Sequence, residues 1–173
     1  GSGIAVGIVL GANRFMMRAF EPYVYYLSPT PRIILFPVMI MWFGVGPGSK
    51  IALGALSAFF AIALSTAAGM RQIDPILIKV GRSFRANVWQ MAVKIYLPAM
   101  RVPILNGIRL GMGTAIITVL LGETKLSNQG LGYLIMQIYT RFDMPGLYAL
   151  LITVFIIAGA VNALIGHFAR DKA

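Results

Sequence analysis

The chain reads IALGALSAFFAIALSTAAGM from Ile51 to Met70, and this stretch decides its fold class. It carries no charge and has the roughly 20 apolar residues that a helix needs to cross a bilayer. In lipid only helices and closed barrels satisfy every backbone hydrogen bond, and barrel strands alternate apolar with polar side chains. This stretch does not alternate, so the sequence predicts an all-α membrane protein.

The composition supports this prediction. Hydrophobic residues make up 58% of the 173 residues and charged residues only 12%, whereas soluble domains hold about 25% charged residues. The net charge of +10 does not indicate a nucleic-acid partner, because the basic residues stand at the ends of apolar runs. Without cysteine there is no disulfide or thiolate metal site. We interpret His167 as an interfacial side chain and expect no metal site.

Other apolar runs flank this stretch. Residues 102–122, interrupted by Arg109, and residues 144–168 are each long enough to span. Pro37 interrupts residues 33–45 and predicts a kink or break, so this run spans only if its helix starts near residues 23–28. Residues 4–11 are too short to cross and are interpreted as the tail of a truncated membrane helix. We expect about five membrane helices in one domain over 1–173, and a helix at 131–139 that dips partly into the membrane.

The distribution of basic residues predicts the orientation. One side holds Arg14, Arg18, Arg32, the stretch 71–101, Arg170 and Lys172. The other side holds only Lys50, Lys125 and Arg141, with Glu123 and Asp143 beside the last two. Because cytoplasmic loops carry an excess of Lys and Arg, we expect the stretch 71–101 and the C-terminus in the cytoplasm, and Glu123 outside.

The stretch 71–101 is basic, amphipathic and too broken to cross a bilayer. Asp74-Pro75 predicts a helix start, with Asp as N-cap and Pro at the first helical position. An apolar stripe follows, formed by Ile76, Leu77, Val80 and Phe84. After a corner at 85–87 we expect a second helix over 88–95, which Leu97-Pro98 ends because proline disfavours helical geometry in the preceding residue. Such a helix pair either docks into a partner's groove or anchors the protein to the membrane surface, and composition leaves both open.

The spacing in this stretch is similar to the signature loop of ABC-importer permeases: Glu-Ala-Ala, three residues, Gly, nine residues, Ile-x-Leu-Pro. Lys79-Val80-Gly81 takes the place of the triplet, Arg85 that of the glycine, and Ile95-Tyr96-Leu97-Pro98 closes the motif. Further strings, in order, resemble the nitrate/sulfonate/taurine/bicarbonate branch of these permeases. They are Pro29-Thr30-Pro31, Trp42-Phe43-Gly44-Val45-Gly46, Gly107-Ile108-Arg109-Leu110-Gly111 and Gly130-Leu131-Gly132-Tyr133-Leu134-Ile135. The resemblance covers residues 3–168.

This resemblance implies the transmembrane subunit of an ATP-driven importer with the all-α fold of type I ABC-importer permeases. Such a chain lies in the bacterial inner membrane, has no catalytic residue and binds no cofactor, and this sequence has no Gly-rich loop ending in Gly-Lys-Ser/Thr. In such importers a separate cytoplasmic ATPase subunit binds ATP, and an extracytoplasmic binding protein delivers the substrate. A second permease subunit, most simply an identical copy, completes the substrate pathway through the lipid bilayer. The branch favours a small anion such as nitrate, a sulfonate, taurine or bicarbonate.

The resemblance also implies site residues. Those expected to couple to the ATPase as a rigid lever are Lys79, Val80, Gly81, Arg82, Ser83, Phe84, Arg85, Ile95, Leu97 and Pro98. Candidates for the substrate pathway are Arg109, Met112, Thr114, Thr118 and Glu123, of which Glu123 begins an outer loop that can reach the binding protein. An intramembrane Arg109 is a functional candidate by its charge, or it snorkels to the interface. The Met and Thr side chains line the pathway, or they only pack the helix.

Two positions depart from the family pattern. Lys79 stands where the family usually has Glu, and Arg85 where it usually has Gly. If the corner needs a left-handed residue, Arg costs about 1–2 kcal/mol there, unless Asn87 takes the strained geometry instead.

Three other functions remain open. One is a permease-like scaffold with degenerate coupling, motivated by Lys79 and Arg85. Another is an ATP-independent transporter or channel, which favours acidic residues inside the spans, and these spans have none. The third is a membrane enzyme, disfavoured by the lack of cysteine and of paired carboxylates.

Overall fold

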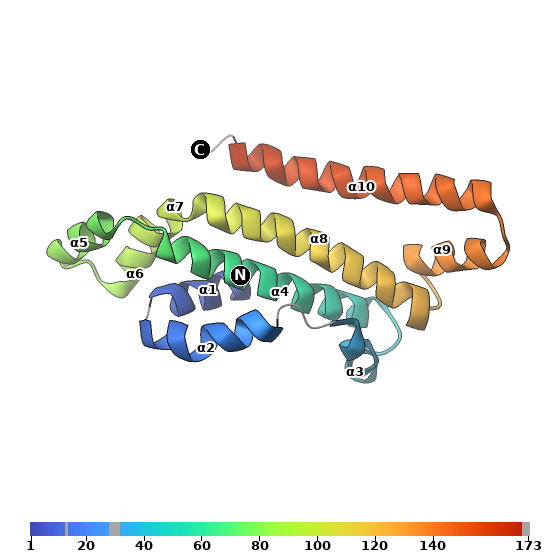
Figure 1. Cartoon of the computed structure of the whole chain (residues 1–173), viewed down its shortest axis with the longest axis horizontal. Coiled ribbons are helices and arrows are strands. Elements are labelled where there is room, and N and C mark those ends of the chain that lie inside the picture. Colours follow the sequence, from blue (N-terminus) through green and yellow to red (C-terminus); the bar gives the residue numbers. More distant parts are fainter. Residues whose placement is uncertain (13, 28–31, 171–173) are drawn as a thin grey trace. The chain divides into compact units, whose positions relative to one another are not determined.

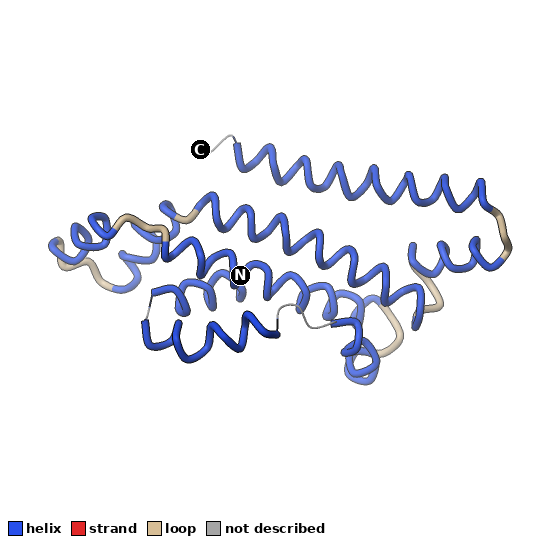
Figure 2. Tube along the Cα trace, in the orientation of Figure 1, coloured by secondary structure: helices blue, strands red, loops and turns tan. Residues whose placement is uncertain are grey.

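The computed structural model describes residues 1–12, 14–27 and 32–170, and within these ranges the chain forms helices and no strands (Figures 1 and 2). The all-α prediction is therefore confirmed. Some features named above lie outside the described residues. They are the Pro29-Thr30-Pro31 string, Lys172, and the side chains of Arg14, Arg32, His167 and Arg170.

Three helices are long and apolar enough to cross a membrane in the part of the chain that is described. They are α4 (Pro47–Arg71), α8 (Arg101–Leu126) and α10 (Met144–Arg170). These match the apolar runs 51–70, 102–122 and 144–168 of the sequence, and Arg109 does not break α8. The large apolar side chains of α10 are mostly exposed, among them Phe155 and Ile156, as in a helix that faces lipid.

The other two expected membrane helices are short. Helix α1 (Ser2–Ala12) has 11 residues, and α3 (Phe36–Phe43) has 8. A 3₁₀ turn, η1 (Arg32–Leu35), precedes α3 and puts Pro37 in the first turn of α3, where a missing N–H costs nothing. The chain thus changes from a 3₁₀ turn to an α-helix just before Pro37, and the predicted kink or break stays a prediction. Helix α9 (Leu131–Thr140) occupies the segment expected to dip into the membrane.

The contacts divide the chain into two compact units, and α4 and α8 each run through both. Unit 1 comprises Gly1–Pro29 and Phe59–Leu110, and includes α2 (Arg14–Leu27). Unit 2 comprises Thr30–Ala58 and Gly111–Lys172. The single domain over 1–173 stays a prediction.

In unit 1, glycines four residues apart let α1 lie directly against α4. A Cβ at Gly7 would stand 2.4 Å from the Thr66 Cβ, and one at Gly11 would stand 2.3 Å from the Met70 Cβ. Small residues at this spacing allow membrane helices to approach closely. Met70 also belongs to an apolar core with Ile73, Met100 and Ile104, which joins α4, α8 and the segment between them.

In unit 2, the core lies where α3, α4 and α8 meet. Phe36 and Leu53 are fully buried, and a Cβ at Gly122 would stand 3.2 Å from the Phe36 ring. Gly54 of α4 faces Val119 of α8 in the same way. These contacts bring the start of α4 beside the end of α8, which is where the polar groups of unit 2 gather.

Candidate functional site

The stretch 71–101 folds as a helix pair at one end of unit 1 (Figure 1). Helix α5 (Pro75–Ser83) starts as predicted, because Asp74 is its N-cap and accepts a 2.8 Å hydrogen bond from the Ile76 N–H. The second helix begins at α6 (Val88–Met91). Asn87 caps it in a reciprocal capping box with Gln90, a local signal visible in the sequence as Asn-x-x-Gln.

The predicted end of the second helix at Leu97-Pro98 is wrong. The chain continues from α6 through a π-helical segment, η2 (Ala92–Tyr96), into α7 (Leu97–Ala99). The Leu97 N–H donates to the Ala92 carbonyl, and Leu97 keeps helical angles (φ −59°, ψ −46°). The wider π turn shifts the hydrogen-bond register just before Pro98, which has no N–H to donate, so the proline begins a new helical turn.

The corner between the helices is a Schellman motif centred on Arg85. The Ala86 N–H donates to the Gly81 carbonyl at 3.0 Å, and the Arg85 N–H donates to the Arg82 carbonyl at 2.9 Å. This motif needs a left-handed residue, and Arg85 has φ 51°. Asn87 has φ −71°, so the alternative that Asn87 takes the strained geometry is wrong. Arg85 therefore bears the conformational free-energy cost of a left-handed arginine.

This strain leads to a first testable prediction. Arg85→Gly is expected to stabilise the corner by about 1–2 kcal/mol, because glycine adopts positive φ freely. Arg85→Ala is the matched control, since it removes the same charge but keeps the strained geometry. Hydrogen exchange at the Ala86 amide, measured by mass spectrometry in detergent, should slow in Arg85→Gly alone. Equal slowing in both variants would show that the charge, not the backbone, destabilises the corner.

The helix pair is held together from the inside by three of the predicted coupling residues. Gly81 is buried, and a Cβ there would stand 2.3 Å from the end of Ile95 and 2.5 Å from the sulfur of Met91. Ile95 and Leu97 are partly buried, and Leu97 packs against the unit 1 core. These residues shape the pair and do not form its outer surface.

The other predicted coupling residues lie on the outer surface. Phe84 is 83% exposed, and the hydroxyl of the exposed Ser83 donates to the Lys79 carbonyl. The exposed set is Lys79, Val80, Arg82, Ser83, Phe84, Arg85 and Pro98. The apolar stripe predicted for α5 is also exposed, as are Val88 and Trp89 on α6. The pair thus presents apolar and basic side chains together, which suits a partner surface.

Four of the substrate-pathway candidates, Arg109, Met112, Thr114 and Thr118, lie along α8. The Thr114 hydroxyl donates to the Gly111 carbonyl at 3.0 Å and lies 3.4 Å from the Ser57 carbonyl, and the Thr118 hydroxyl donates to the Thr114 carbonyl at 2.7 Å. Both hydroxyls therefore bond to helix backbone. Met112 is partly buried on α8, and Arg109 is exposed on the same helix. Their role in a substrate pathway stays a prediction.

Glu123 is at the centre of a polar cluster in unit 2. Its carboxylate lies 3.0 Å from the Lys50 ammonium and accepts a 2.9 Å hydrogen bond from the Gly132 N–H. The Lys50 ammonium also donates to the Gln129 carbonyl. Only 9% of the Glu123 side chain and 14% of the Lys50 side chain are exposed. We call this cluster the Glu123 latch, because it fastens the α8–α9 connection to the start of α4.

Two glycines make room for the Glu123 latch. Gly130 has φ 116°, and a Cβ there would stand 2.1 Å from a carboxylate oxygen of Glu123. A Cβ at Gly132 would stand 2.4 Å from the Leu120 carbonyl oxygen. The sequence interpretation gave Glu123 an outward role and missed Lys50, Gly130 and Gly132. The sequence did contain one signal for this contact: Lys50 and Glu123 carry opposite charges at the ends of two apolar runs.

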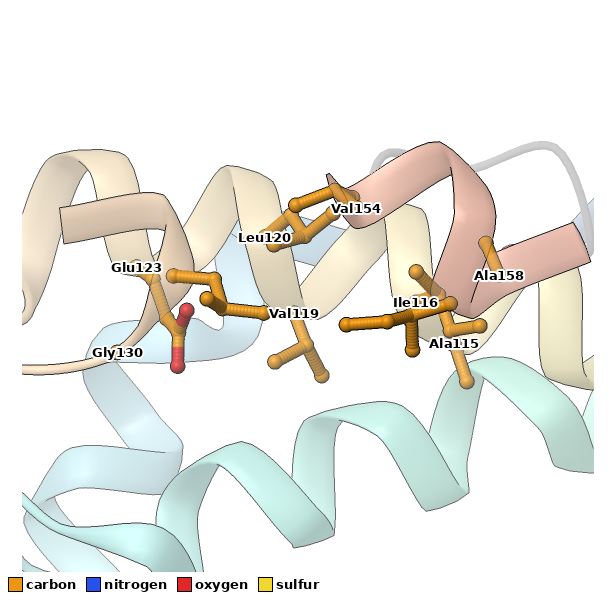
Figure 3. Close-up of a pocket in the computed structure, with 10 residues that line it drawn as sticks. Ala115, Ile116, Val119, Leu120, Glu123, Gly130, Val154 and Ala158 are labelled. Carbon is orange, nitrogen blue, oxygen red and sulfur yellow. The ribbon is translucent and has the colours of Figure 1, made fainter. Parts of the chain in front are cut away.

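A cavity of about 480 Å³ lies beside the latch, between α8, α9 and α10 (Figure 3). Its walls are apolar, and Figure 3 shows the Glu123 carboxylate at the end near Gly130. Of the five substrate-pathway candidates, only Glu123 lines it. That carboxylate already has two partners, so the cavity offers a ligand mainly apolar contacts.

Comparison with known relatives identifies similar proteins along nearly the whole chain. The taurine transport system permease protein TauC of Escherichia coli is 29% identical over 94% of this chain and 60% of its own length. The putative aliphatic sulfonates transport permease protein SsuC of Bacillus subtilis is 36% identical over 79% of this chain and 50% of its own length. The formylaminopyrimidine transport permease protein ThiX of Halalkalibacterium halodurans is 31% identical over 85% of this chain and 62% of its own length.

These relatives are longer than the present sequence, which spans about half to three fifths of their length. The family model for binding-protein-dependent transport system inner membrane components matches residues 3–172. This match covers both units, the helix pair and the three long apolar helices. The resemblance inferred from the sequence motifs is confirmed: the chain belongs to the family of binding-protein-dependent transport system inner membrane components, which are multi-pass membrane proteins.

Proposed function

We propose that this chain is the transmembrane subunit of an ATP-driven importer and that its helix pair at 71–101 docks into a separate cytoplasmic ATPase subunit. The observation that carries the proposal is the exposed outer surface of α5, held in one geometry by the Schellman corner and by the contact of Gly81 with η2. A rigid, exposed, amphipathic helix is suited to lie in a partner's groove. The chain itself then performs no catalysis and binds no ATP.

The proposal includes an orientation. The helix pair and the C-terminus face the cytoplasm, because the basic residues of the chain concentrate there. Lys50 and Glu123, which the charge pattern assigns to the outer side, are in contact in unit 2 and support a common side for both. Membrane lipid surrounds the long helices, and a second permease subunit, most simply a second copy, completes the pathway.

The substrate is proposed to be a small molecule that carries a negatively charged group, a sulfonate such as taurine, delivered by an extracytoplasmic binding protein. The support is the similarity to the taurine transport system permease protein TauC and to the putative aliphatic sulfonates transport permease protein SsuC. Nitrate and bicarbonate, which are small anions, stay as alternatives. The formylaminopyrimidine relative shows that similar chains also serve other molecules, so uptake of labelled taurine should be compared with uptake of nitrate.

The docking proposal is tested by Phe84→Ala. Phe84 is 83% exposed, so its removal should change the free energy of unfolding by less than about 0.5 kcal/mol. Capture of the ATPase from native membranes, followed by mass spectrometry, should fall about tenfold, because exposed aromatic anchors carry much of the energy of an interface. Phe155→Ala on the exposed face of α10 is the matched control and should leave capture unchanged.

Absence of any ATPase from a folded preparation of the unaltered chain would contradict the importer proposal. It would favour the permease-like scaffold or the ATP-independent transporter. Capture that survives Phe84→Ala undiminished would leave the ATPase as a partner but would move the docking surface away from the tip of α5.

A further inference from the structure

We infer that the ATPase groove that receives this helix pair is acidic, and that Lys79, Arg82 and Arg85 select for it. This inference rests on the proposed docking function and specifies the chemistry of the partner. It is carried by the placement of charge on α5 and by the strain at Arg85.

Helix α5 has three distinct faces. Ile78 and Gly81, three residues apart, face inward toward the unit 1 core and η2. Ile76, Val80 and Phe84, four residues apart, form an exposed apolar ridge. Lys79 and Arg82, also three apart, form a basic ridge, because residues at these spacings are neighbours on a helix surface. A groove that fits α5 therefore has an apolar floor and a wall that meets the basic ridge.

The basic ridge has no acidic counterpart of its own. The stretch 71–101 contains one acidic residue, Asp74, whose carboxylate is used as the N-cap of α5. No carboxylate of a described side chain forms an ion pair with Lys79, Arg82 or Arg85. Bringing these charges against a neutral or basic groove would be unfavourable, whereas carboxylates there would pair with them.

Arg85 provides an independent argument. It holds the left-handed position of the Schellman corner, which glycine would occupy without strain. Strained backbone is often found where a side chain has a functional role, and here the side chain adds a positive charge beside Phe84 at the exposed corner. A fluid layer of lipid headgroups would accept a basic side chain in any arrangement. A shaped groove benefits from the fixed geometry that the corner provides.

The experiment uses the full chain in nanodiscs and the ATPase subunit identified by the capture described above. Arg82→Glu should weaken ATPase binding about tenfold, and Lys79→Glu and Arg85→Glu similarly, since like charges in an interface repel. Lys94→Glu is the matched control: it makes the same charge change in the same loop, on the exposed side of η2, and should change affinity by less than about threefold. The difference should shrink between about 0.05 and 0.5 M KCl because salt screens charges.

The outcomes separate the two proposals. If no ATPase binds the unaltered chain, both fall. If the ATPase binds but the reversed variants bind equally well or more tightly, the acidic groove is wrong and the docking proposal stands. A third result would assign the basic ridge to the membrane surface. In that case the ATPase affinity is unchanged in the reversed variants. The fluorescence emission of Trp89 then shifts when the nanodisc contains phosphatidylglycerol, and this shift is lost in Arg82→Glu. A Trp42→Phe background isolates Trp89, since the chain has two tryptophans.

Discussion

Replacing Glu123 by alanine is expected to lower the free energy of unfolding by about 3–5 kcal/mol, because it leaves the largely buried Lys50 ammonium without its counter-ion. The Gly132 N–H also loses its acceptor. The Gln129 carbonyl still accepts from Lys50, but a neutral acceptor compensates only part of a buried charge. The measurement is the denaturant midpoint in mild detergent, followed by size-exclusion chromatography for monodispersity.

Two controls make this prediction specific. Adding Lys50→Met to Glu123→Ala should recover much of the loss, because the unpaired charge disappears. Asp143→Ala removes another carboxylate that accepts a backbone N–H, that of Gly146 at 3.1 Å, but from an exposed position. It should cost only about 1 kcal/mol, as for the loss of a helix cap. Similar losses in Glu123→Ala and Asp143→Ala would show that the Glu123 latch contributes little.

The Glu123 latch bears on the substrate-pathway role expected for Glu123, which stays a prediction. A carboxylate that already bonds Lys50 and Gly132 is not available to a substrate without breaking these contacts. Its effect on transport would then act through the α8–α9 connection, which it fastens to α4. Such a positioning role would differ from the outward reach expected from the sequence.

Local signals in the sequence predicted local structure well. Asp74-Pro75 predicted the start of α5, and the structure shows the cap bond to Ile76. The long apolar runs predicted α4, α8 and α10, because a membrane span depends only on composition over about 20 residues. The motif spacing predicted the family, which the match over residues 3–172 confirms.

Local structure that depends on neighbouring residues was predicted less well. Leu97-Pro98 was expected to end a helix, but the π turn at η2 shifts the register and the helix continues. Asn87 was considered for the left-handed position, although the capping box with Gln90 needs it extended. In each case a neighbouring hydrogen bond outweighed the intrinsic preference of one residue.

Contacts between distant residues were not predictable from the pattern. The charge pattern placed Lys50 and Glu123 on the same side of the membrane, but it could not predict that their side chains form an ion pair. Gly81 was assigned to the docking surface because it falls within the motif. The structure instead places it inside the helix pair, where it lies against the ends of the Ile95 and Met91 side chains.

This placement changes what a substitution at Gly81 tests. Gly81→Trp is expected to separate α5 from η2, because the indole has no space between these segments and overpacking costs about 3 kcal/mol or more at such a site. Loss of the pair should reduce ATPase capture about 100-fold, which corresponds to about 2.7 kcal/mol. Hydrogen exchange across 76–84 should rise toward the unfolded rate while α4 and α8 stay protected.

Gly81→Ala is the matched control for Gly81→Trp. Its Cβ meets the ends of the Ile95 and Met91 side chains, which can move, and alanine gains about 1 kcal/mol of helix propensity. Capture and exchange should therefore stay close to those of the unaltered chain. If Gly81→Trp abolishes capture while exchange over α5 is normal, Gly81 contacts the partner directly, and the exposed ridges are not the whole docking surface. Normal capture together with fast exchange would mean that the ATPase does not need a preformed helix pair.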